Sequence, residues 1–139
     1  ETMLEECDGA LIIGDRAISA ALSNPDLVRM DLGSEWTKIT GLPMVFGVFA
    51  SRKDSPTVLI NEAMQSMLRS YNKFLEDEKI KSDVASIASK KIGLPIDRVR
   101  NYFESEVSNT LDKTSIDGLL VFLKEVCEMD SEPSWLVSA

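Results

Sequence analysis

Two short runs of the chain are apolar at every position. Residues 9–14 read Gly-Ala-Leu-Ile-Ile-Gly, and residues 44–50 read Met-Val-Phe-Gly-Val-Phe-Ala directly after Pro43. A strand that is buried on both faces shows no polar alternation, because both faces meet apolar neighbours. The pattern predicts two strands in the interior of a sheet, and the run at 44–50 is the stronger.

After residue 50 the apolar residues recur at the period of a helix. Ser55 and Pro56 supply a cap and a proline at the first helical position, so a helix is expected to about Glu78. Its predicted inward face consists of Ile60, Met64, Met67, Tyr71 and Phe74.

Shorter helices are expected on both sides of this long one. They cover residues 16–22, 34–41, 82–93 and 114–128, and another begins at Pro95 with Val99, Tyr102 and Phe103 inward. The acidic run at residues 76–79 is expected to be a solvated turn. Residues 27–32 are expected to form a further short extended piece. Two or three strands followed by helices, with nothing to cover one strand edge, predict an α/β fold with a truncated sheet.

The length and the net charge of the chain limit the kinds of function that it can have. The 139 residues suit one domain, and 15 basic against 23 acidic residues give a net charge of −8. Such a surface argues against nucleic acid and against an anionic membrane as partners. No apolar run reaches the roughly 18 residues that would cross a bilayer.

The chain contains no histidine. The commonest general base and the commonest metal ligand are therefore missing, which excludes a Ser-His-Asp triad and argues against a zinc site within these residues. Cys7 and Cys127 lie far apart without the spacing of metal ligands. They are expected to be reduced thiols of a cytosolic protein, and a single disulfide is the alternative.

The step from Gly14 to Asp15 is the most suggestive position for ligand binding. Ligands of open α/β sheets lie beyond the carboxyl ends of strands, where the next helix offers free N–H groups to an anion. Arg16 could add a contact to a carboxylate. The alternative, which the residues alone favour, is that Asp15 only caps a helix. Trp36, Thr40 and the turn at residues 41–43 are equally open, because turn chemistry explains Gly41 and Pro43 and simple packing would explain Trp36.

Three blocks resemble the sequence of one enzyme family. Residues 9–17 read GALIIGDRA, residues 31–36 DLGSEW and residues 40–46 TGLPMVF. In order and spacing they are similar to the segments ALLIGDxAL, DLGEEW and TGLPFVFA of chorismate dehydratases, which open the futalosine route to menaquinone. DGLLVF at residues 117–122 resembles the family's GLxxF, so the likeness spans most of the chain.

A sister enzyme of the same pathway, a naphthoate synthase, differs at one informative place. Its sequence resembles IHEG at the place where this chain has Ile13, Gly14 and Asp15. The histidine of that motif acts as a base. The absence of histidine favours the dehydratase. Phe49 departs from the dehydratase pattern, which often has tryptophan there.

The resemblance implies a C-terminal portion of a two-lobed fold like that of type II periplasmic binding proteins. Residues 1–43 would belong to the second lobe, with a strand, a helix and turns that face the cleft. Residues 44–139 would supply a crossover strand and the C-terminal helices of the first lobe. The partner implied is the N-terminal half of the same enzyme.

The resemblance also implies a reaction and a set of site residues. A cytoplasmic lyase would remove water from chorismate to give 3-[(1-carboxyvinyl)oxy]benzoate, without cofactor or metal. Its substrate would contact Gly14, Asp15, Thr40, Pro43 and Phe46, and the catalytic base is left open. A non-catalytic solute-binding protein of the same fold is the alternative, and the two apolar runs argue against a purely helical interaction module.

Overall fold

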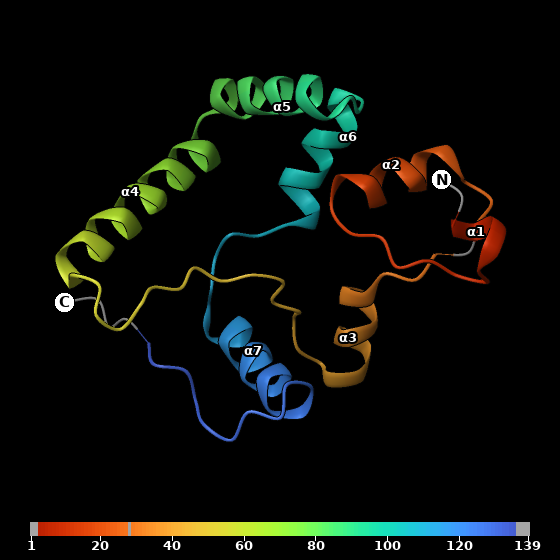
Figure 1. Cartoon of the computed structure of the whole chain (residues 1–139). Helices are drawn as coiled ribbons and strands as arrows, with labels where there is room; N and C mark the ends of the chain where they lie inside the picture. Colours follow the sequence, from red (N-terminus) through yellow and green to blue (C-terminus); the bar gives the residue numbers. More distant parts are fainter. Residues whose placement is uncertain (1–2, 28, 136–139) are drawn as a thin grey trace.

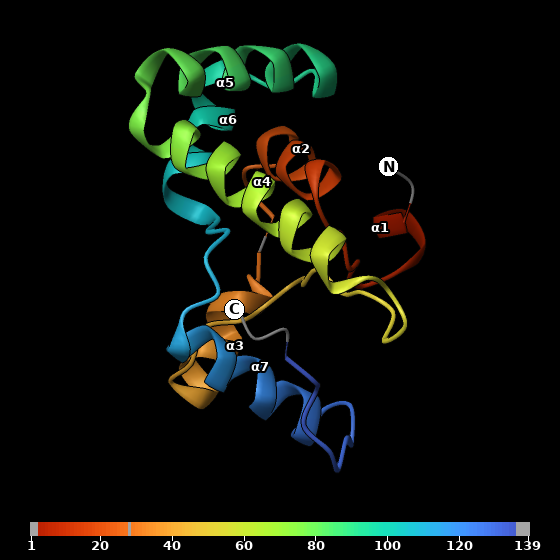
Figure 2. The ribbon, with the colours of Figure 1, turned by 90° about the vertical axis from the view of Figure 1, so that its left-hand side faces the viewer.

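The computed structural model describes residues 3–27 and 29–135 (Figures 1 and 2). Its helices are α1 (Met3–Glu6), α2 (Asp15–Ser23), α3 (Leu32–Thr40), α4 (Thr57–Glu76), α5 (Glu78–Ile92), α6 (Ile96–Asn101), the π-helix η1 (Tyr102–Glu106) and α7 (Lys113–Glu125). In both views α2, α4, α5 and α6 lie towards one end and α3 and α7 towards the other. No helix in these ranges combines the length and apolar character needed to cross a membrane.

The two runs predicted as strands are not strands here. Residues 9–13 and 43–50 have no secondary structure, and no part of the described chain forms a strand. A strand needs a neighbour to pair its N–H and C=O groups, and here neither run has one. Phe46 and Phe49 are 78% and 89% exposed instead. The α/β fold is not confirmed, and what the structure shows is mostly helical.

Aspartate side chains start three of the helices. The carboxylate of Asp31 accepts from Ser34 N at 2.7 Å, and that of Asp112 accepts from Ser115 N at 2.8 Å. These hydrogen bonds favour the charged form, so the pKa of Asp31 lies below its ordinary value. Asp77 accepts from Lys79 N at 2.8 Å.

These caps correct two predicted boundaries. Because Asp77 caps α5, that helix begins at Glu78 rather than at residue 82, and the acidic run is not simply a turn. Because Asp112 caps α7, the expected capping box at residues 114–117 already lies inside the helix. The predicted ends at Gly41 and Gly93 are confirmed, since both glycines adopt left-handed backbone angles after α3 and α5.

One small core joins α2, α5 and α6. Ala85, Leu94 and Val99 are buried, and each belongs to α5, to α6 or to the turn between them. The partly buried residues packed against them are Ile18, Ala88, Ile92 and Phe103. Phe103 also meets Phe74 edge-on at a centroid distance of 6.0 Å, which links η1 to α4.

A second contact joins α3, the turn after it and α7. The rings of Trp36 and Phe122 meet edge-on at 5.6 Å between centroids. Leu119 is buried, and next to it Gly118 lies directly against the backbone carbonyl of Pro43. A β-carbon at Gly118 would overlap the carbonyl oxygen of Pro43, so the glycine permits the close approach.

Gly118→Ala tests this second contact. We expect it to lower the free energy of unfolding by up to about 2 kcal/mol, since overpacking of about 1–3 kcal/mol is offset in part by the roughly 1 kcal/mol that Ala gains over Gly in a helix. Urea unfolding followed by circular dichroism measures the difference. Gly9→Ala is the matched control, because none of the described atoms lies within 4 Å of its added β-carbon. Equal stability of the two variants would contradict the contact.

Candidate functional site

A small cavity lies where α2 meets α5, α6 and η1. Its volume is about 110 Å³, and we call it the α2 pocket. Its lining consists of Asp15, Ile18, Ala88, Ile92, Leu94, Arg98, Val99, Tyr102 and Phe103. Ligand clefts usually enclose roughly 300–1,000 Å³, so this cavity suits one end of a small molecule rather than all of it.

Gly14 precedes α2, the helix whose residues Asp15 and Ile18 line this pocket. Its φ of 63° and ψ of −146° belong to a backbone region that is essentially reserved for glycine. The carbonyl of Gly14 accepts from Ala17 N at 2.9 Å and begins the helix. Gly14 therefore occupies the cap position and Asp15 is the first helical residue. The interpretation of Asp15 as only a helix cap is wrong, because the cap position belongs to Gly14.

The structure gives a backbone reason for a glycine at position 14. None of the described atoms lies within 4 Å of the position of an added β-carbon, so no packing contact demands a glycine there. The requirement comes from the positive φ.

Arg98 contributes the pocket's only lining cation. Its Nη2 donates to Glu106 Oε2 at 2.9 Å, whereas its Nη1 is buried and has no hydrogen-bond partner among the described residues. Arg98 lies one turn before η1, in which Val107 N donates to Tyr102 O, five residues back, at 3.2 Å. Such π-type turns often occur at functional sites.

The other predicted site residues lie elsewhere. The hydroxyl of Thr40 donates to Trp36 O at 2.8 Å and accepts from Leu42 N at 3.1 Å, so it ties the end of α3. Pro43 contacts Gly118, and the ring of Phe46 lies against Gly33. The structure thus gathers Asp15 into the α2 pocket and places Thr40, Pro43 and Phe46 near α3, outside that pocket's lining.

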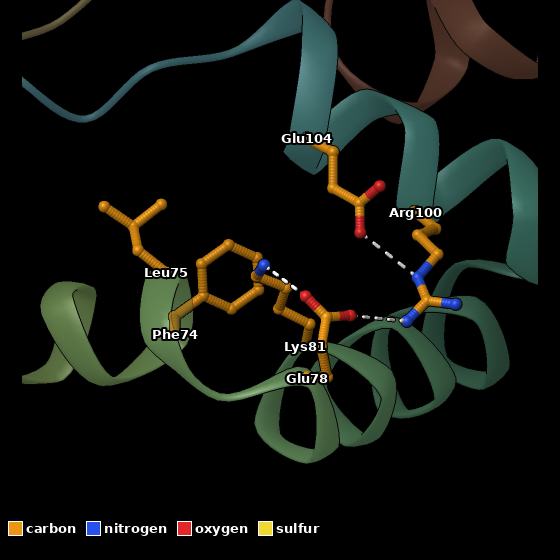
Figure 3. A pocket seen from close by; sticks show the side chains of 6 residues that line it. All are labelled: Phe74, Leu75, Glu78, Lys81, Arg100 and Glu104. Carbon is orange, nitrogen blue, oxygen red and sulfur yellow. Dashed lines mark hydrogen bonds and ion pairs between the residues drawn. The ribbon is translucent and has the colours of Figure 1, made fainter.

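A larger and more open hollow of about 520 Å³ lies between α4, α5, α6 and η1 (Figure 3). Glu78 lies between two cations there, 2.5 Å from Lys81 Nζ and 3.5 Å from Arg100 Nη2. Arg100 Nε also contacts Glu104 at 3.2 Å. The hydrogen bond from Lys81 holds the pKa of Glu78 below its ordinary value. Both cations already have carboxylate partners, so this hollow is better explained as an ion-pair network than as an anion site.

Comparison with models of known protein families shows to which family the chain belongs. Residues 1–128 match the family described as menaquinone biosynthesis, and the chain belongs to that family. The match supports the pathway that the three sequence blocks indicated. No solved structure matches the chain.

The sequence indicated some of the pocket and missed the rest. Helical periodicity placed Val99, Tyr102 and Phe103 inward, and all three line the cavity. Arg98 was missed because the pocket also needs Asp15 and Ile18 of α2, which lie more than seventy residues earlier in the chain. The charged pattern around it is that of an ordinary exposed helix face.

Gly14→Ala tests the entry into the pocket. We expect it to lower the free energy of unfolding by about 1–3 kcal/mol, because alanine must adopt a strained backbone conformation. Gly47→Ala is the control, since Gly47 has a negative or extended φ and no described atom within 4 Å of the added carbon. Thermal denaturation compares the two, and a Gly14→Ala variant as stable as the parent would contradict the assigned backbone conformation.

Proposed function

We propose that this protein is a lyase of menaquinone biosynthesis that removes water from chorismate to give 3-[(1-carboxyvinyl)oxy]benzoate. The observation that carries the proposal is the match of residues 1–128 to the menaquinone biosynthesis family. The blocks at residues 9–17, 31–36 and 40–46, in the order seen in chorismate dehydratases, support this particular step. The absence of histidine favours it over the sister naphthoate synthase.

The reaction needs little from the protein beyond positioning. Loss of the ring proton beside the hydroxyl, together with loss of that hydroxyl, creates an aromatic ring and one molecule of water. A site lowers the barrier by fixing both carboxylates and excluding solvent. If no side chain serves as base, a carboxylate of the substrate itself accepts the proton. The proposal therefore needs neither cofactor nor metal.

The proposed site includes Gly14, Asp15, Thr40, Pro43 and Phe46. These residues lie in two places in the chain as described, so a further part of the protein is needed to form one cleft. We assign that part to an N-terminal half, with which the chain forms a two-lobed, cytoplasmic enzyme like type II periplasmic binding proteins. The uncovered runs at residues 9–13 and 44–50 support such an assembly, because they offer unpaired backbone groups.

Incubation of chorismate with the complete gene product tests the reaction. We expect the ultraviolet absorbance of the diene to fall and the benzoate to appear in equal amount by liquid chromatography. The chain of 139 residues alone should give no product.

Two results would contradict the proposal. A folded, complete gene product that binds chorismate without converting it would instead support the solute-binding alternative. Full activity in the isolated chain would refute the need for an N-terminal half.

A further inference from the structure

We draw no further inference here: the strongest candidate, the apolar stripe of α4 on which Met67, Leu68 and Leu75 are exposed, carries none because nothing in the described part of the chain shows what covers it.

Discussion

The dominant physical feature of this structure is the large apolar surface that the described chain leaves exposed to solvent. The accessible surface is 11,248 Å², whereas a compact protein of 15.4 kDa exposes roughly 7,200 Å². The excess of about 4,000 Å² is several times the ~800 Å² that each partner buries in a standard interface. The helices pack locally, and the two apolar runs and much of α4 do not meet a second layer. Not one residue of α4 is buried, although its apolar residues follow a helical stripe.

Local physical chemistry explains which predictions from the sequence were right. The positions of the helices follow from periodicity and from Gly41 and Gly93, because these signals act within one or two turns. The starts of α5 and α7 differ from the predicted ones because several nearby residues are suitable helix caps. Only the hydrogen bonds in the structure show that Asp77 and Asp112 are the caps. The strands predicted at residues 9–13 and 44–50 are absent because a strand must pair with a segment that can be distant in the sequence. The hydrophobic pattern of one segment carries no information about its pairing partner.

The candidate site shows the same division between local and distant information. Gly14 and Asp15 stand out in the sequence as a step between an apolar run and a helix, and the structure gives that step a backbone conformation suited to glycine. Arg98 joins Asp15 only because α2 and α6 line the same pocket, an arrangement that no spacing in the sequence encodes. Membership of the menaquinone biosynthesis family says in which pathway the protein acts. The structure adds that Asp15 and Arg98 line the same mostly apolar pocket.

Differential scanning calorimetry of the 139-residue chain measures most directly whether its apolar surface is covered. The heat-capacity change of unfolding reports apolar area that becomes exposed, and a fully packed protein of this length would show about 1.7–2.1 kcal/mol/K. We expect a clearly smaller change, with a broad transition or self-association. A single cooperative transition of a monomer with a heat-capacity change in the full range would contradict the account.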